Sequence, residues 1–190
     1  MSGALIALIV VVVIVLIVVF WYISTRNGII SFRNRVDESW SGIDVQLKRR
    51  HDLVPNLVET VKGYATHESA VFEKVTQARA DAMSTPDTNV AGTAKAEGQL
   101  DRALADLRAV AEAYPDLKAT ENFQQLSRNL SELEDEIQAS RRIYNSNVQS
   151  YNTKIQQFPA SIVANQGGFT DREFYEIEDA AQRESPSVSF

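Results

Sequence analysis

The chain has 190 residues, of which 25 are acidic and 19 basic, and its formal net charge is -6. This mild acidity argues against a general nucleic-acid-binding protein, which would present a net basic face. The chain contains no cysteine, which fits a cytoplasmic domain and equally an extracytoplasmic domain without disulfides.

An uninterrupted apolar run opens the chain. From Ala4 to Ile23 no side chain is charged, and one helix of this length can cross a bilayer. A cleaved signal peptide is the competing interpretation. Against it, the apolar block is too long, no Lys or Arg precedes it, and no Ala-x-Ala site follows. The sequence therefore predicts an uncleaved transmembrane anchor over residues 1–25.

Aromatic and basic residues mark the exit of that span, where amphipathic rings favour the headgroup level. The predicted membrane-interface residues are Phe20, Trp21, Tyr22 and Arg26. Arg33 and Arg35 follow on the same side, whereas the N-terminal tail has no basic side chain. The positive-inside rule thus predicts a single-pass protein with its bulk domain in the cytoplasm.

Apolar residues then recur at alternating spacings of four and three. The series is Val36, Trp40, Ile43, Leu47, Arg50, Val54, Leu57, Val61, Tyr64, Glu68, Val71, Val75, Ala78 and Ala82. This heptad pattern predicts one long helix with a coiled-coil-like face, broken only by Arg50 and Glu68. Pro55 lies inside it, and because the register continues across the proline we expect a kink rather than a break.

Two further helices follow a run of turn-forming residues at 84–89. The second helix carries Leu100, Leu104, Leu107 and Ala111 on one face, and Pro115 either stops it or starts the next. The third is long. Its apolar series is Phe123, Leu126, Leu130, Leu133, Ile137, Tyr144, Val148, Tyr151, Ile155 and Phe158.

A capping-box pattern at Thr170 and Glu173 predicts a short C-terminal helix. No alternating strand pattern occurs outside the membrane segment. The expected fold class is all-α, with an N-terminal transmembrane helix followed by an elongated antiparallel helical bundle of long coiled-coil-like helices. The bundle domain is expected over residues 26–181, with a loose tail at 182–190.

Catalytic motifs are missing from the sequence. His51 and His67 are too far apart to share a helix turn and complete no paired metal-binding pattern. The chain has no nucleophile elbow and no glycine-rich phosphate loop. We therefore predict a non-enzyme without catalytic residues, cofactor, metal or small-molecule substrate.

Several polar residues are candidates for an oligomer or partner interface. They are Lys48, Arg49, Arg50, Glu68, Tyr144, Asn145, Tyr151 and Asn152. The basic run forms either a solvated face with local ion pairs or a site for carboxylates at 132–136, in the same bundle or in a neighbouring subunit. Arg50 and Glu68 either pair locally or set the register between subunits. The Tyr-Asn pairs are either core residues, with their hydroxyls at the edge, or they form an interhelical hydrogen-bonded layer or a groove for a partner.

Extended motifs in this chain resemble the LemA family. They are WS at 40–41, QLKRRHDLVPNLV at 46–58, VKGY at 61–64, AYPDLKA at 113–119, RRIYN at 141–145, YN at 151–152 and FP at 158–159. The resemblance covers the anchor and nearly the whole bundle. It implies a bacterial single-pass membrane protein with a helical-bundle domain. It also includes relatives implicated in building magnetosome membranes.

The leading functional hypothesis is a membrane-anchored scaffold that self-associates and organises or remodels the bacterial inner membrane. A short segment between the span and a rigid bundle would hold neighbouring domains close together. The alternative is a monomeric membrane-bound adaptor that presents a helical face to another membrane protein, such as a protease or signalling partner. The expected partners are thus membrane lipid, further copies of the chain and possibly another membrane protein, but no nucleic acid.

Overall fold

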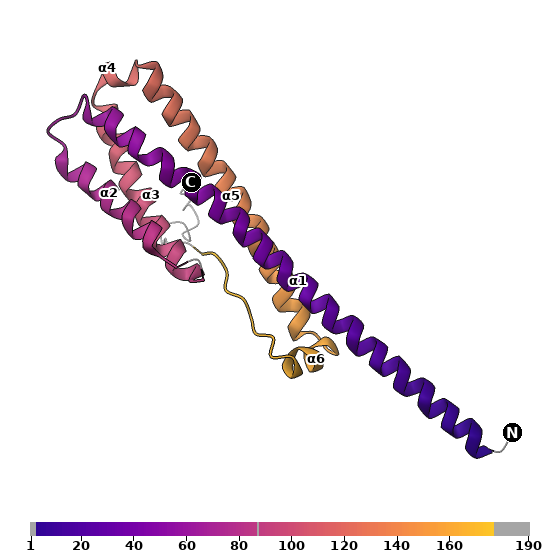
Figure 1. Cartoon of the computed structure of the whole chain (residues 1–190). Coiled ribbons are helices and arrows are strands. Elements are labelled where there is room, and N and C mark those ends of the chain that lie inside the picture. Colours follow the sequence, from indigo (N-terminus) through magenta and orange to yellow (C-terminus); the bar gives the residue numbers. More distant parts are fainter. Residues whose placement is uncertain (1–2, 87, 177–190) are drawn as a thin grey trace, which may run out of the picture. The chain divides into compact units, whose positions relative to one another are not determined.

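A computed structural model describes residues 3–86 and 88–176 of the chain. Within these ranges every regular element is a helix and no strand occurs, which confirms the all-α class (Figure 1). The helices are α1 (Gly3–Lys62), α2 (Ser69–Ser84), α3 (Val90–Glu112), α4 (Pro115–Lys118), α5 (Glu121–Gln156) and α6 (Ala160–Gln166).

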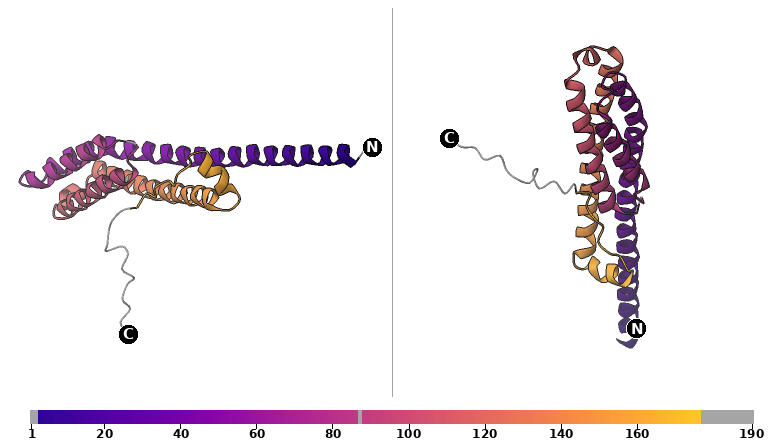
Figure 2. Two further views of the ribbon diagram at one scale, coloured as in Figure 1. Left: turned by 90° about the horizontal axis from the view of Figure 1, so that it is seen from below. Right: turned by 90° about the vertical axis from the view of Figure 1, so that its left-hand side faces the viewer.

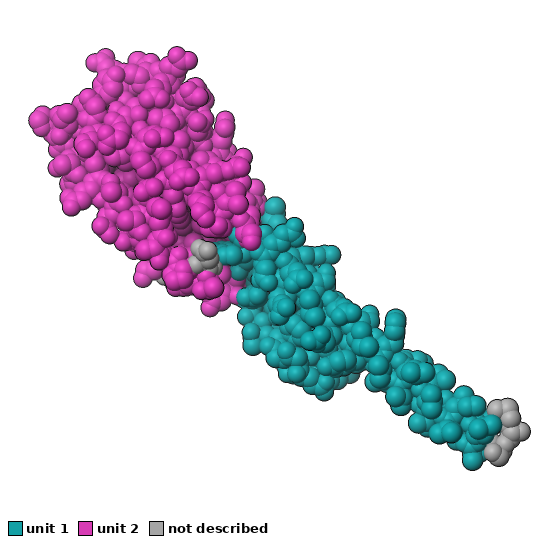
Figure 3. Space-filling model, in the orientation of Figure 1, with its two compact units in different colours: residues 1–40, 143–172 teal, residues 41–142, 173–190 magenta. Residues whose placement is uncertain are grey.

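The chain divides into two compact units (Figure 3). Unit 1 combines the residues up to Trp40 with residues 143–172, and unit 2 combines residues 41–142 with the described residues from Glu173 onward. The long helices α1 and α5 each contribute to both units.

The apolar run forms the first part of α1. The most apolar stretch of this helix has no buried residue, and the helix is long and apolar enough to cross a membrane. Exposed aliphatic side chains over five turns would be costly in water, whereas hydrocarbon solvates them without cost. The observed exposure therefore fits a transmembrane span.

Beyond the apolar run, unit 1 is an antiparallel pair of α1 and α5 with α6 beside it (Figure 2). The rings of Trp40 and Tyr144 lie 5.3 Å apart between centroids, and the Asn147 amide donates to the Arg35 carbonyl at 3.3 Å. The buried apolar residues of this unit include Ile29, Val36, Tyr144, Val148, Tyr151, Ile155, Ala160 and Val163. The predicted apolar series of the first and third helices therefore faces the interior here, except for its last member, Phe158, which lies after the end of α5 and is 81% exposed.

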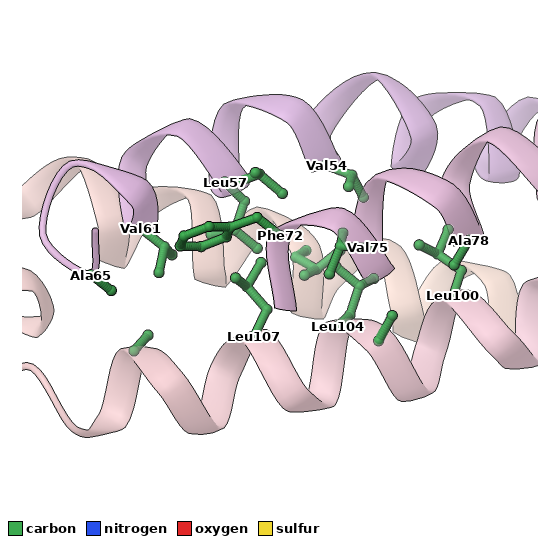
Figure 4. Packing of buried hydrophobic residues seen from close by; sticks show 14 of the residues in the cluster. Val54, Leu57, Val61, Ala65, Phe72, Val75, Ala78, Leu100, Leu104 and Leu107 are labelled. Carbon is green, nitrogen blue, oxygen red and sulfur yellow. The ribbon is translucent and has the colours of Figure 1, made fainter. Parts of the chain in front are cut away.

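In unit 2 the core is built from all five of its helical segments. Phe72 and Val75 of α2 lie against Leu104 and Leu107 of α3 (Figure 4). The core also includes Val54, Leu57 and Val61 of α1, Leu117 of α4 and Leu130 of α5. The predicted core positions of the second helix are confirmed, and Pro115 starts α4 as its first residue.

The single helix predicted across the first heptad series is wrong. The chain does continue as a helix through Pro55, but α1 ends at Lys62 and α2 begins at Ser69. Gly63 follows the last helical residue, and the Tyr64 amide tightens the turn by donating to the Val61 carbonyl at 3.0 Å. The heptad spacing persists because both helices turn their apolar faces to the same core, so periodicity alone does not reveal the reversal.

The capping-box helix predicted after Thr170 is also wrong over the described residues, since residues 169–176 are not helical. Backbone groups of this segment form hydrogen bonds with side chains of α5 instead. The Asn152 amide accepts from the Arg172 backbone N–H and donates to its carbonyl, both at 2.9 Å. The Tyr151 hydroxyl donates to the Thr170 carbonyl at 3.1 Å. These bonds hold an extended segment against α5, and the predicted tail lies outside the described residues.

Candidate functional site

A charged cluster lies inside unit 2, where an apolar core would be expected. Its centre is Arg50 of α1, whose side chain is 1% exposed. The guanidinium donates to the Asp101 carboxylate at 2.6 Å and to that of Glu134 at 3.1 Å, and it also pairs with Glu97. These contacts join α1 to α3 and α5. We call Arg50, His51, Glu97, Asp101 and Glu134 the Arg50 cluster.

His51 completes the contacts of Glu97 from the next position on α1. Its Nε2 lies 2.7 Å from a Glu97 carboxylate oxygen, and both side chains are buried. The His51 carbonyl in turn accepts a hydrogen bond from Arg79 of α2 at 2.7 Å. All four long segments of unit 2 therefore contact the cluster or its backbone.

Electrostatics keep Glu97 ionised inside the core. Burial opposes its charge, but the hydrogen bond with His51 and the charge of Arg50 outweigh burial, so the pKa of Glu97 is lowered. Burial likewise opposes the charge of Arg50, but Glu97 and Asp101 outweigh it and raise the pKa of the guanidinium. The pair is therefore charged at neutral pH.

Asp101 responds in the opposite direction. Burial raises the pKa of this carboxyl, and repulsion from Glu134 and Glu97 adds to the effect, against the attraction of Arg50. One guanidinium thus serves three carboxylates, so Asp101 is the acid that protonates more readily than usual.

Tyr175 closes the charged region from the extended C-terminal segment. Its ring is 1% exposed, and the Arg141 guanidinium lies 5.1 Å from the ring centroid, a cation–π distance. Burial raises the pKa of the phenol, and the charge of Glu97 adds to that effect. The ring therefore packs as a neutral phenol.

The chemistry available to the Arg50 cluster is ion pairing. Glu97 contacts Arg50 and His51, and Asp101 and Glu134 both contact Arg50. Among the described residues no group of three or more His, Cys, Asp or Glu side chains could hold a metal ion. The arrangement is that of a buried polar layer that joins helices.

The structure separates the three residues of the predicted basic run. Lys48 and Arg49 are exposed and make long ion pairs, to Asp44 at 3.8 Å and to Glu136 at 3.7 Å. Arg50 is buried and pairs within the chain, which is the local-pairing alternative for this residue, and a role at an interface between subunits stays a prediction. Successive residues of a helix point in different directions, and Arg50 alone falls on the heptad face. Its carboxylate partner Glu134 was among the acidic positions considered, but the pairing is within the chain.

Glu68 lies apart from Arg50. It is half-buried at the N-cap of α2, where its side chain makes no capping hydrogen bond. Its backbone carbonyl accepts from Val71 at 3.1 Å. The two polar interruptions of the heptad series thus have different surroundings.

Both predicted Tyr-Asn pairs lie on the part of α5 in unit 1. Tyr144 and Tyr151 are buried, and Asn145 and Asn152 are half-buried. The second pair holds the extended C-terminal segment, so the partner of this hydrogen-bonded layer belongs to the same chain. The predicted membrane-interface residues lie on α1, with Phe20 and Arg26 exposed and Trp21 and Tyr22 half-buried.

A surface groove runs between α1 and α5 of unit 2. We call it the α1/α5 groove, and its volume is about 450 Å³. It is lined by Arg49, Asp52, Leu53, Asn56, Asn129, Glu132, Leu133 and Glu136. Basic and acidic side chains therefore face the same exposed depression.

Comparison with known proteins places this architecture in a family. The LemA family profile matches residues 39–190, which include the Arg50 cluster and the α1/α5 groove. The chain belongs to the LemA family. Protein LemA of Metamycoplasma hominis is 32% identical over 145 residues, which cover 76% of this chain and 66% of that protein.

Two further relatives of this LemA family member carry the name of a magnetosome protein. Magnetosome protein MamQ 2 of Paramagnetospirillum magneticum is 24% identical and MamQ of Magnetospirillum gryphiswaldense 22% identical, each over 178 residues. Both matches cover 81% of this chain and 65% of the relative. The chain thus spans slightly less than two thirds of the length of these curated relatives.

Sequence reasoning did not find Glu97 and Asp101, two of the three carboxylates of the Arg50 cluster, in this LemA family chain. Glu97 and Asp101 stand one turn apart on the apolar face of α3, next to Leu100 and Leu104. Acidic residues on an apolar face are a signal for a buried cation. Together with Arg50 on the face of α1, that signal was present in the sequence.

Proposed function

We propose that this protein is a non-enzymatic, membrane-anchored scaffold that self-associates and organises the bacterial inner membrane. Residues 1–25 serve as the anchor, residues 26–181 as the bundle domain and residues 182–190 as a tail. The bulk domain lies in the cytoplasm, because the arginines that follow the span favour that side.

The continuity of α1 is the observation that supports this proposal best. The apolar run passes without a break into the part of α1 that packs against α5 in unit 1. A packed pair of helices that starts directly after the span leaves no long flexible linker. Anchored copies therefore meet in a thin layer at the membrane, where their effective concentration is high.

Charges in the α1/α5 groove suit contact between copies. Arg49 and Glu136 are 61% and 52% exposed, and their atoms are 3.7 Å apart. Exposed pairs of this kind are worth little within one molecule. Exchanging them for the same pair across two copies costs little, so the groove offers both charges for contact with the groove of a second copy.

The contacts of the Arg50 cluster support a structural role rather than catalysis. Its carboxylates are used in ion pairs that join three helices. The magnetosome relatives support a role at membranes, because their name refers to a membrane-bounded structure. A scaffold requires both properties, a rigid domain and attachment to the membrane.

Sizing of the full chain after extraction in a mild detergent tests the proposal. We expect a large uniform assembly. Arg49→Glu and Glu136→Arg should each reduce its size, because each places like charges on the pair. Lys62→Glu, a charge reversal on α1 outside the groove, is the control and should leave the size unchanged.

Mixing the two variants distinguishes pairing between copies from pairing within one copy. When Arg49→Glu and Glu136→Arg chains with different tags are made together, opposite charges meet only across copies. Recovery of a mixed assembly supports the proposal. A monomeric wild type instead favours the adaptor that presents a helical face to another membrane protein.

A further inference from the structure

Unit 1 contains a basic pocket close to the end of the apolar run. It has a volume of about 300 Å³, at the lower end of the range of about 300–1,000 Å³ for small-molecule sites. Arg26, Ile30 and Arg33 of α1 form one wall, and the loop from Gly167 to Arg172 forms the other. Tyr151 of α5 also lines it.

The first wall follows from helical spacing. Arg26, Ile30 and Arg33 are four and three residues apart, so they share one face of α1. Both arginines therefore line the pocket from the same face of α1.

The loop wall is fixed by its own contacts with unit 1. Asn152 holds both backbone groups of Arg172, and the Arg172 guanidinium pairs with Asp37 of α1 at 2.8 Å. The Phe169 ring lies 5.7 Å from the Arg33 guanidinium. Gly168 turns the chain at a φ of 66°, a conformation that favours glycine. The pocket is thus preformed.

The charge balance of the pocket favours an anion. Arg172 is paired with Asp37, and Asp171 accepts from Gln156 at 3.0 Å. Arg26 and Arg33 have no ion-pair partner among the described residues. Three arginines and one carboxylate, that of Asp171, line the pocket, so its charge balance is positive. Guanidinium geometry matches phosphate oxygens, and the pocket therefore suits a phosphate group.

The height of the pocket matches lipid headgroups. Arg26 lies three residues beyond Ile23, a rise of about 4.5 Å along the helix, and Arg33 lies about 15 Å beyond it. Headgroups occupy roughly 5–7 Å on each side of the hydrocarbon core. Arg26 therefore lies at the height of that layer, and Arg33 lies about two turns further along the same face of α1.

Exposed apolar residues lie in the same unit. Phe158, in the turn after α5, is 81% exposed, and Ile162 of α6 is 46% exposed. Exposed apolar side chains beside a span are typical of contact with the membrane interface. They fit a unit whose α6 side rests on lipid.

We propose that the pocket between Arg26, Arg33 and the Gly167–Arg172 loop binds the phosphate of an anionic phospholipid headgroup. The acyl chains follow the exposed apolar face of α1. The inference rests on the membrane anchor of the proposed function. It adds a specific lipid contact that self-association does not require.

Native mass spectrometry of the full chain in uncharged detergent tests this inference. The lipids are phosphatidylglycerol and phosphatidylcholine, added in separate titrations, and a third titration uses inorganic phosphate. We expect phosphatidylglycerol to bind at least about tenfold more tightly than phosphatidylcholine. Arg33→Gln should weaken that binding about tenfold or more, because a charge-assisted contact is lost.

Arg35→Gln is the matched control. It removes the same charge two residues away, where Arg35 stacks on Phe32 outside the pocket, and it should leave binding unchanged. Melting temperature in the same detergent verifies the fold. Arg33→Lys keeps a positive charge and should recover much of the binding.

Several results would overturn the assignment. They are equal binding of both lipids, equal loss in Arg33→Gln and Arg35→Gln, no gain in Arg33→Lys over Arg33→Gln, or inorganic phosphate binding as tightly as phosphatidylglycerol. The last result would assign the pocket to free phosphate. Because assembly size is measured separately, failure of lipid binding leaves the scaffold proposal standing, and a monomeric protein can still bind the lipid.

Discussion

Glu97 shows how much a single buried carboxylate contributes to this fold. It contacts both Arg50 and His51, and its side chain is 2% exposed. Removal of one partner from a buried ion pair leaves an uncompensated charge in a region with little water. The loss of either half of the buried pair should therefore destabilise unit 2.

Glu97→Gln should accordingly lower the free energy of unfolding by about 3 kcal/mol or more, because Arg50 and His51 lose their shared anion. Thermal or urea unfolding of the full chain in detergent measures this. Asp135→Asn, at an exposed carboxylate on α5 outside the α1/α5 groove, should change stability by less than about 0.5 kcal/mol. Equal stability of the two variants would contradict the view that the Arg50 cluster holds unit 2 together.

Acid should destabilise the protein partly through Glu97. The pKa of this group is lower in the folded chain than its ordinary value. Its stabilising contribution is therefore complete above that ordinary value, and it is lost as pH falls through the lowered pKa. Between pH 7 and pH 3 the free energy of unfolding should fall less steeply with pH for Glu97→Gln than for the wild type.

Asp101 has the opposite effect on the change of stability with pH. Its pKa is raised in the folded chain, so the folded state binds the proton first and gains stability on acidification. Asp101→Asn removes that gain, and the loss of stability in acid should become steeper. A shallower loss of stability for Asp101→Asn would show that the pKa of Asp101 is lowered in the folded chain rather than raised.

At the scale of elements, Asn152 helps to hold the C-terminal segment against α5. Its amide pairs with both backbone groups of Arg172, as a neighbouring strand would. Asn152→Ala removes two hydrogen bonds worth about 0.5–1.5 kcal/mol each. Trypsin should then cleave after Arg172 about tenfold faster than in the wild type.

Gln149→Ala is the control for that cleavage. Gln149 lies one turn earlier on α5, is exposed, and bonds Thr153 rather than the segment. Its substitution should leave the rate unchanged. If Asn152→Ala is cleaved no faster than Gln149→Ala, the segment is held by other contacts, such as the packing of Tyr175.

The elements also show which parts of the fold can be read from sequence. Leu100, Leu104 and Leu107 were predictable because helical spacing reports directly which face is buried. The reversal at Gly63 was not, since α1 and α2 share a register. The extended segment after Thr170 was missed because its backbone partners are side chains of α5, distant in sequence.

The candidate site divides in the same way. The position of Arg50 on the heptad face was evident from spacing, but its partners required knowing which helix faces α1. Glu97 and Asp101 come from α3, 47 and 51 residues away. Long-range pairing of this kind depends on the order in which helices pack, which periodicity does not encode.

At the scale of the whole molecule, topology follows from the arginines after the span. If Arg26, Arg33 and Arg35 keep the bulk domain inside, a reporter fused after Phe190 should be active only when it works in the cytoplasm. A reporter that requires the periplasm should remain silent at the same site. Strong signal from the periplasmic reporter would reverse the assignment.

Self-association at the membrane is the central claim, and counting copies in the native membrane tests it most directly. A fluorescent fusion is expressed at low level and its spots are followed by single-molecule photobleaching. The account predicts spots that bleach in many steps, with fewer steps in the Arg49→Glu variant than in Lys62→Glu. Spots that bleach in a single step for the wild type would contradict it.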